Sequence, residues 1–254
     1  MCVRIIPCIL LLMVTAAAPA LAGPYYARGT YYAGSVETWG YDAGNELFDD
    51  GNHGDGAAGD GVYGAYVTAD QEPGPHEWKI STEDWTENYP NNPAYSMSNA
   101  VLYLMDWGEV IHFRLDTNTL DEGWQPATNA VACSHFDIPL PDFEFELIGS
   151  APELGEWLSG IPVVMEEDLW FAYATIAAPG LHEFKFRVID TWNLCNLGIH
   201  YNMFNGDNFT FETTEPQTIV RFEFNVVDGR GRALLEGNVD VEDMAWGQVK
   251  GLYR

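Results

Sequence analysis

The sequence predicts an all-β fold built from two tandem immunoglobulin-like β-sandwiches, followed by a short C-terminal helix. Three observations lead to this prediction: segments in which apolar and polar residues alternate, clusters of Gly, Pro, Asn and Asp between these segments, and an internal repeat. Alternation with a period of two is typical of strands, and the small and polar residues between them favour turns. Repetition of a strand-rich unit indicates that one module is present twice.

Residues 1–22 have the pattern of a secretory signal peptide. One cation, Arg4, precedes an apolar run, and the small residues Ala20-Leu21-Ala22 stand directly before Gly23. The apolar run is too short to span a bilayer, and no later segment approaches the about 20 apolar residues that a spanning helix needs. The sequence therefore predicts a secreted, periplasmic or cell-surface protein without membrane insertion.

Eight segments of the remaining chain show strand-like alternation and are rich in aromatic and β-branched residues. In chain order they are VYGAYVT (62–68), EWKIS (77–81), VIHFRL (110–115), FEFELIG (143–149), WFAYATI (170–176), HEFKFRVI (182–189), NFTFET (208–213) and TIVRFEFNV (218–226). Helical spacing of apolar residues occurs only after residue 240, at Met244, Ala245, Val249 and Leu252.

The internal repeat sets the predicted domain boundaries. The matching stretches are Pro73-Gly74 with Pro179-Gly180, residues 110–113 with 219–222, and Gly34-Ser35 with Gly149-Ser150. We therefore expect a first sandwich over residues 23–118, a linker or packed connector over 119–140, a second sandwich over 141–228, and a tail with the helix over 229–254. Each unit has enough short strands for an immunoglobulin-like sandwich.

Charge excludes two classes of partner. The chain has 11 Lys and Arg against 38 Asp and Glu, so its formal net charge is −27. Such a protein repels the phosphates of nucleic acids and the headgroups of anionic lipids. The simplest interpretation of the acidity is solubility.

Two cysteines, Cys133 and Cys195, lie beyond the predicted signal peptide. Outside the cytoplasm they can form a disulfide that closes a long loop, which would stabilise the fold by constraining the unfolded chain. The alternative is two separate buried thiols, and spacing does not decide between them.

The repeated strand carries the candidate binding residues. Alternation places Lys185 and Lys79 on the face of the strand opposite the aromatic core residues, so we expect both to point outward into solvent. A tryptophan follows each lysine in a polar loop. An indole in a polar loop is a flat apolar plate that can stack on the C–H face of a sugar ring. The predicted plates are Trp192 and Trp85 after the lysines, and Trp157 and Trp39 after the two Gly-Ser turns.

The run LIGSAPELGEWLSGIPVVMEEDLWFAYATIAAPGLHEFKFRVIDTWN (147–193) resembles the starch-binding modules of carbohydrate-binding families 20 and 48. The resemblance covers most of the second copy and implies an immunoglobulin-like sandwich that binds α-glucan. It implies that Trp157 and Trp192 stack on sugar rings and that Lys185 contacts hydroxyl groups. It also implies an asparagine contact, with Asn193 and Asn196 as alternatives in one loop and Asn208 in the NGDNFTF segment.

The first copy keeps Trp39, Lys79 and Trp85 but lacks the Leu-Gly that precedes Trp157, and it carries the insertion LFDDGNHGDGAAGDGVY (47–63). Oxygen ligands are what calcium prefers, so the insertion is a candidate calcium site. The spacing does not fit an EF-hand, and the alternative is a turn held by hydrogen bonds from Asp side chains. The candidate ligands are Asp49, Asp50, Asp55 and Asp60.

No catalytic constellation emerges from the sequence, because the serines lie outside a nucleophile-elbow motif and carboxylates are too abundant for one pair to stand out. We therefore expect a secreted, non-catalytic protein that binds a polysaccharide or oligosaccharide. The alternative is an exported structural or adhesive protein, with or without calcium, whose tryptophans pack in the core or in an interface.

Overall fold

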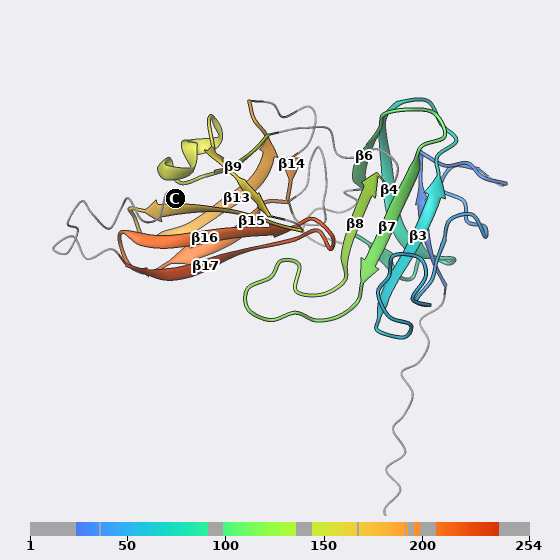
Figure 1. The fold of residues 1–254 in the computed structure, drawn as a ribbon, viewed down its shortest axis with the longest axis horizontal. Helices are drawn as coiled ribbons and strands as arrows, with labels where there is room; N and C mark the ends of the chain where they lie inside the picture. Colours follow the sequence, from blue (N-terminus) through green and yellow to red (C-terminus); the bar gives the residue numbers. More distant parts are fainter. Residues whose placement is uncertain are drawn as a thin grey trace, which may run out of the picture.

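The computed structural model describes residues 24–35, 37–90, 99–135, 144–166, 168–190, 192, 196–198 and 207–238. These residues form seventeen strands and one 3-10 helix, and every strand pairing is antiparallel, so the predicted all-β fold class is confirmed. The strands form two sandwiches that follow one another in the chain (Figure 1). The predicted signal peptide and C-terminal helix lie outside the described residues.

The first sandwich has two sheets. In one sheet the order is β2 (Glu46–Leu47), β1 (Tyr25–Gly29), β4 (Gly74–Thr82) and β5 (Asn88–Tyr89), and β6 (Ala100–Leu104) also pairs with β4. The other sheet has the order β3 (Val62–Thr68), β7 (Val110–Asp116) and β8 (Ala130–His135).

The second sandwich repeats this plan. One sheet has the order β10 (Ile161–Pro162), β9 (Phe145–Gly149), β13 (Gly180–Val188) and β14 (Asn196–Leu197), with β15 (Phe209–Thr213) also paired to β13. The other has the order β11 (Val164–Glu166), β12 (Leu169–Ile176), β16 (Thr218–Asn225) and β17 (Arg230–Asn238). The 3-10 helix η1 (Pro152–Trp157) follows β9, and β11 has no counterpart among the described strands of the first sandwich.

Register shows how closely the copies agree. Gly29 of β1 lies opposite Trp78 of β4, and Gly149 of β9 lies opposite Phe184 of β13. At both glycines a Cβ atom would come within 2.3–2.4 Å of a carbonyl oxygen of the facing strand. No other residue fits there, so the same close approach of two strands requires glycine in each half.

Aromatic side chains of facing sheets fill the space between them. In the first sandwich the rings of Trp78 and Phe113 lie 5.1 Å apart, and in the second those of Phe184 and Phe222 lie 4.8 Å apart. All four side chains are fully buried. Alternation along β4, β7, β13 and β16 therefore points their aromatic residues into the interior, as the sequence predicted.

The ends of both sandwiches differ from the predicted boundaries, because β8 and β17, which occupy equivalent places in the two sandwiches, lie beyond them. β8 lies in the stretch predicted as a linker and pairs with β7 along its length, and β17 lies in the predicted tail and pairs with β16. The first sandwich thus continues to residue 135 and the second to residue 238. In β8 four consecutive residues are buried, so no alternation marks it, and β17 contains two glycines, which are uncommon in strands.

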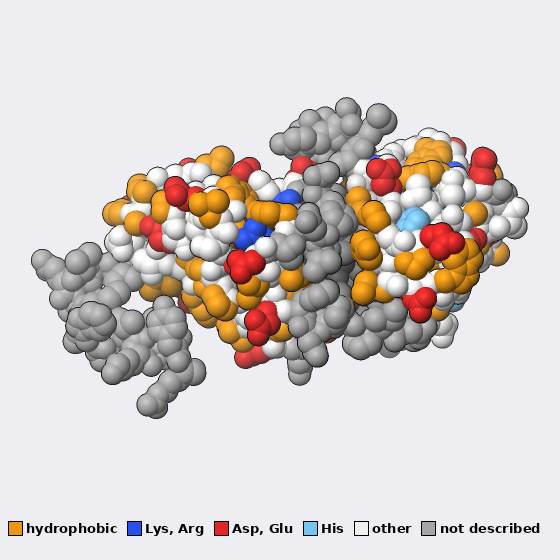
Figure 2. Space-filling view, turned by 90° about the horizontal axis from the view of Figure 1, so that it is seen from above, with side chains coloured by type: hydrophobic (Ala, Val, Ile, Leu, Met, Phe, Trp, Pro, Cys, Tyr) orange, Lys and Arg blue, Asp and Glu red, His pale blue; other side chains and the backbone are white. Residues whose placement is uncertain are grey.

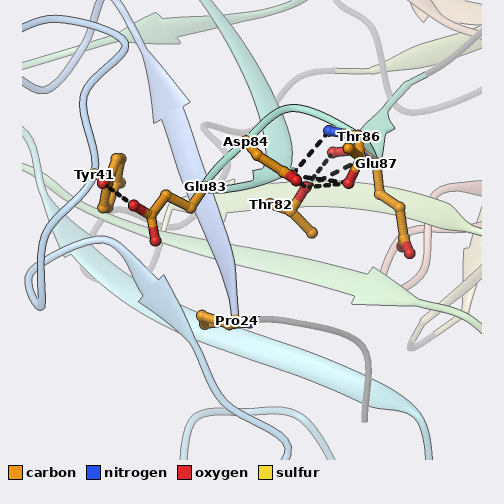
Figure 3. A pocket seen from close by; sticks show the side chains of 7 residues that line it. All are labelled: Pro24, Tyr41, Thr82, Glu83, Asp84, Thr86 and Glu87. Atoms are coloured by element: carbon orange, nitrogen blue, oxygen red, sulfur yellow. Dashed lines mark hydrogen bonds between the residues drawn. The ribbon is translucent and has the colours of Figure 1, made fainter. Parts of the chain in front are cut away.

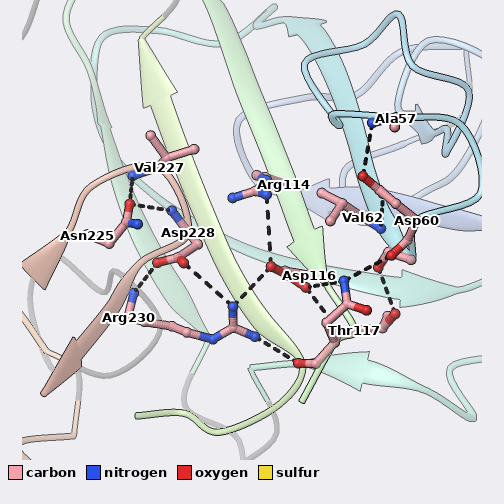
Figure 4. Close-up of polar contacts among 12 residues, drawn as sticks. Ala57, Asp60, Val62, Arg114, Asp116, Thr117, Asn225, Val227, Asp228 and Arg230 are labelled. Carbon is pink, nitrogen blue, oxygen red and sulfur yellow. Dashed lines mark hydrogen bonds and ion pairs between the residues drawn. The ribbon is translucent and has the colours of Figure 1, made fainter. Parts of the chain in front are cut away.

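The loop between β7 and β8 joins the two sandwiches (Figure 1). Arg230 at the start of β17 is fully buried, and its Nη1 lies 3.0 Å from Asp116 Oδ2 at the end of β7 and 3.6 Å from Asp228 Oδ2 (Figure 4). Its Nη2 donates to the carbonyl of Asn118 and its Nε to the carbonyl of Pro126. One guanidinium therefore contacts residues near both ends of the loop between β7 and β8.

Neighbouring residues extend this joint. Gln125 and Gly231 exchange two backbone hydrogen bonds, and the side-chain amide of Gln125 bonds in both directions to the backbone of Thr210. The guanidinium of Arg232 stacks over the ring of Trp124 at 4.2 Å. The part of the predicted connector that precedes β8 thus packs against the second sandwich.

The surface bears the predicted excess of acid. Figure 2 shows acidic side chains scattered over both halves of one face rather than gathered in a single patch. Among the helices of the described residues, none has the length and apolar character to cross a membrane.

Candidate functional site

Two tryptophans lie side by side at the end of the second sandwich. Trp157 ends η1, between β9 and β10, and Trp192 lies between β13 and β14. Their ring centroids are 6.2 Å apart and their planes are inclined by 47°. Trp157 is half-buried, and 38% of Trp192 is exposed. The predicted plates of the second copy are therefore neighbours, with open indole surface.

The first sandwich has the same pair at the equivalent place. Trp39 lies between β1 and β2, and Trp85 lies between β4 and β5. Their centroids are 6.1 Å apart with planes inclined by 46°, and 36% of Trp85 is exposed. The two pairs have nearly the same geometry although the loops that carry them differ in sequence.

Three of these four tryptophans have a strained backbone. The φ angles of Trp39, Trp85 and Trp157 are 67°, 62° and 67°, in the left-handed region that favours glycine. A bulky residue there costs roughly 1–3 kcal/mol and persists only where the surroundings enforce it. Such residues gather at ligand-binding sites more than elsewhere, so the strain marks these loops as functional candidates.

Hydrogen bonds hold the loop that carries Trp39. Asp42 accepts from the backbone N–H and hydroxyl of Ser35, from the N–H of Gly44 and from the hydroxyl of Tyr32. Burial alone would raise the pKa of Asp42, but these hydrogen bonds outweigh it and lower the pKa to about 2. The loop is therefore held by an ionised carboxylate at neutral pH.

An arginine lies against the second tryptophan of each pair, a feature that the sequence analysis missed. The guanidinium carbon of Arg28 lies 4.0 Å from the ring centroid of Trp85, and that of Arg187 lies 4.3 Å from the ring of Trp192. Both arginines are buried, with 6% and 2% of their surface exposed. Their only sequence signal is position: they stand on the lysine face of the repeated strand or of the strand beside it.

Both predicted lysine contacts are buried, which corrects the expectation of lysines that point outward into solvent. Lys79 is 8% exposed and Lys185 is 6% exposed. The Nζ of Lys79 donates to the carbonyl of Pro90 and to Asn88 Oδ1. Burial lowers the pKa of Lys185 to about 8, against the opposing charges of Asp207 and Glu183. The last five residues of both β4 and β13 are buried on both faces, because loops cover the face that alternation assigned to solvent.

The predicted asparagine contacts have different outcomes. The amide of Asn208 donates to the carboxylate of Glu183, and Asn99 makes the equivalent bond to Glu77 in the first sandwich. These amides tie neighbouring strands and lie away from the loops of the tryptophans. Asn193 and the side chain of Asn196 lie outside the described residues, so their roles stay predictions.

The Asp-rich insertion is held by its own hydrogen bonds. Asp55 is buried and accepts from the N–H groups of Asp50, Gly51 and His53, as in the turn that was the alternative to a calcium site. Asp49 and Asp60 likewise accept from backbone N–H groups of the loop. Within the described residues no three His, Cys, Asp or Glu side chains are grouped to hold a metal. Calcium binding at Asp49, Asp50, Asp55 and Asp60 stays a prediction without geometric support, and calorimetry with calcium against a chelated control tests it.

A cavity of about 480 Å³ lies in the first sandwich beside the loop of Trp85 (Figure 3). The hydroxyl of Tyr41 donates to Glu83 on one side of it, and Asp84 accepts from Thr82 and Thr86 on the other. Pro24 and Glu87 complete the lining. The cavity is therefore lined mainly by carboxylate and hydroxyl groups of this loop, and the indole of Trp85 is not among its lining residues.

The predicted disulfide is not tested by the described residues. Cys133 is buried in β8, in the first sandwich. Cys195 lies outside the described residues, so a bridge between them stays a prediction.

One comparison with known proteins matches this chain. Residues 35–88 match the family model of the conditioned medium factor 2nd Ig-like domain. The matched stretch includes Trp39, Lys79 and Trp85, and covers about a fifth of the chain. The match supports an immunoglobulin-like module and does not point to the starch-binding families. A search of curated proteins returned no match.

Proposed function

We propose that this protein is an exported, non-catalytic carbohydrate-binding protein that stacks uncharged sugar rings on its two tryptophan pairs. The observation that carries the proposal is the recurrence of one arrangement in both sandwiches. Each half has two indoles about 6 Å apart, inclined by 46–47°, with one of them more than a third exposed. Export rests on the signal-peptide pattern of residues 1–22.

The chemistry of an indole fits one face of a sugar ring. The axial C–H groups of a pyranose form an apolar patch that an exposed indole removes from water, while the hydroxyl rim keeps its hydrogen bonds. Two plates inclined to each other contact successive rings of a curved chain better than those of a flat ribbon. This geometry agrees with the α-glucan preference that the family resemblance implies.

Partial exposure and strain favour a binding role over a core role. A tryptophan that served only packing would gain most from full burial, as Trp78 does. Trp85 and Trp192 instead leave apolar surface in water, and Trp85 as well as Trp157, the neighbour of Trp192, has a strained backbone. A net charge of −27 further disfavours anionic polymers as ligands.

The test is electrophoresis of the secreted form in gels that contain glycogen or soluble starch. We expect the wild type to be retarded, and Trp157→Ala or Trp192→Ala to weaken retention by the second sandwich about tenfold or more. Trp107→Ala is the matched control, because Trp107 is 58% exposed in the turn between β6 and β7 and belongs to neither pair. Unretarded wild-type protein would refute the α-glucan proposal and favour the structural or adhesive alternative.

A further inference from the structure

We propose that Arg28 and Arg187 position the two tryptophan pairs and make them selective for uncharged ligands. This inference rests on the proposed function, because it specifies which rings the plates accept. It starts from the guanidinium group that lies against the exposed tryptophan of each pair, 4.0 Å from Trp85 and 4.3 Å from Trp192.

The two arginines reach equivalent places from different strands. Arg28 stands on β1 opposite Lys79, where the second sandwich has Ile148 opposite Lys185. Arg187 stands on β13, two residues after Lys185, where the first sandwich has Ser81. The Nη1 of Arg28 nevertheless lies 3.3 Å from the hydroxyl of Ser81. The position of the positive charge is therefore kept although the residue that supplies it is not.

Each guanidinium also holds the loop of the first tryptophan. The Nε of Arg28 donates to the carbonyl of Trp39 at 2.7 Å. The Nη2 of Arg187 donates at 3.0 Å to the carbonyl of Leu158, the residue after Trp157. Each arginine thus stacks on one tryptophan of its pair and donates a hydrogen bond to the loop of the other. These contacts fix the distance and the angle between the two indoles.

The positive charge has a second consequence for ligands. The face of an indole attracts cations, and a pair of inclined indoles is a general receptor for alkylammonium groups. Here one face of the exposed indole is already occupied by a cation. A second cation on the opposite face would be repelled, whereas a neutral sugar ring would not. The same two plates therefore accept uncharged rings and reject ammonium ligands.

The charge of Arg28 is less compensated than that of Arg187. Arg187 Nε lies 2.6 Å from the buried carboxylate of Glu146. The four hydrogen bonds of the Arg28 guanidinium within the described residues go to neutral oxygens, those of Trp39, Ser81, Thr82 and Glu83, the last through its carbonyl. We therefore expect the first tryptophan pair to reject cationic ligands more strongly than the second, so the first pair is the one to test.

The experiment uses the full secreted chain with Trp157→Ala/Trp192→Ala, so that ligand binding reports on the first tryptophan pair alone. In this background Arg28→Lys keeps the charge and Arg28→Gln removes it while keeping a donor. Binding of maltoheptaose and of tetramethylammonium is measured, together with the exciton couplet of the paired indoles in the circular dichroism spectrum. Arg221→Met is the matched control, since Arg221 stacks on Phe171 and Tyr173 away from both pairs.

We expect Arg28→Gln to reduce the couplet, to weaken maltoheptaose binding about tenfold, and to strengthen tetramethylammonium binding about tenfold. Arg28→Lys should still reject tetramethylammonium, and Arg221→Met should change nothing. An unchanged couplet and unchanged affinities in Arg28→Gln would overturn the inference. If the starting background binds no maltoheptaose, sugar binding by the first pair fails, while the couplet and the tetramethylammonium titration still decide the role of Arg28. Should an Arg28 variant not fold, Arg187→Lys and Arg187→Gln/Glu146→Gln in a Trp39→Ala/Trp85→Ala background repeat the test on the second pair.

Discussion

The two sandwiches share a strand plan but differ in how they support the same surface feature. Both bring two tryptophans to within about 6 Å of each other, from the loops after the first and the repeated strand. In the first sandwich Arg28 of β1 lies against the pair, and in the second Arg187 of β13 does so. The same arrangement of two indoles and one guanidinium is therefore present in both halves, although the arginine comes from a different sequence position in each.

The two halves also differ in the partners of their buried polar groups. Arg187 forms a buried ion pair with Glu146, whereas Arg28 is bonded to neutral oxygens. In the core, Trp78 stands where the second sandwich has Phe184, and the indole Nε1 of Trp78 has no hydrogen-bond partner among the described residues. These differences predict that equivalent substitutions have unequal effects in the two halves.

The largest expected effect concerns the joint between the two halves. Arg230→Met leaves the buried carboxylate of Asp228 without its ion-pair partner and leaves Asp116 with only Arg114, 3.9 Å away, which should cost about 3–5 kcal/mol of unfolding free energy. Chemical denaturation should then show two transitions in place of one. Asp50→Asn is the control, because its ion pair with His53 lies at the surface, away from the joint, and its loss should cost much less. Equal effects of the two substitutions would contradict the account of the joint.

The next effect separates the two arginines. Arg187→Met strands the buried carboxylate of Glu146 and should lower the unfolding free energy by about 3 kcal/mol. Arg28→Met removes hydrogen bonds to neutral oxygens and should lower it by about 1–2 kcal/mol. Adding Glu146→Gln should recover much of the first loss, which urea denaturation of the single and double variants measures. A larger loss at Arg28 would reverse the comparison.

A pH-dependent effect of about 2 kcal/mol is expected at Lys185. Burial lowers its pKa from 10.5 to about 8, so the unfolded chain binds this proton more tightly than the folded protein does. Below about pH 8 the folded protein carries the buried charge and is destabilised by it. As the pH rises toward 10.5 the folded amine loses its proton and this destabilisation disappears, so Lys185 makes the unfolding free energy rise with pH.

Lys185→Met should remove that rise when the unfolding of both proteins is followed from about pH 7 to about pH 9.5, because the tyrosines that begin to ionise near pH 9.5 are the same in the two proteins. Lys79→Met, the equivalent change in the first sandwich, should act in the same direction because burial also lowers the pKa of Lys79. A wild-type and a Lys185→Met profile that run parallel would show that the amine is not desolvated.

The smallest effect is expected in the core of the first sandwich. Trp78→Phe makes this position like Phe184 of the second and removes the buried N–H that lacks a partner. The gain from removing that donor and the loss from the smaller ring nearly cancel, so the unfolding free energy should change by less than about 1 kcal/mol. Phe184→Trp should cost more, since it adds both volume and an indole N–H to a filled core. Thermal unfolding of the two variants makes the comparison.

Much of the fold follows from alternation in the sequence. The segments around Trp78, Phe113, Phe184 and Phe222 were recognised as strands because one of their faces is apolar. The predicted segments also omit β1 and β6. β8 and β17 were missed because alternation disappears in a strand that is buried on both faces or is interrupted by glycines and charged residues. Both are the last strand of their sandwich, so the predicted boundaries ended one strand too early in each half.

The candidate site was predicted in part. Polar loops that contain tryptophan led to both pairs, because an apolar plate in a polar loop must be covered or must bind something. Lys79 and Lys185 were expected to face solvent, since alternation tells which face of a strand a residue occupies but not what covers that face. The same limit hid Arg28 and Arg187, whose role depends on contacts with loops distant in sequence.

The central claim is that each half carries one platform for an uncharged sugar ring, and the most direct measurement is the stoichiometry of maltoheptaose binding by titration calorimetry. We predict two sites per wild-type chain, one site in Trp39→Ala/Trp85→Ala, one in Trp157→Ala/Trp192→Ala, and none when all four residues are replaced. Absence of binding by the wild type, or a site count that does not change when either pair is removed, would contradict the claim.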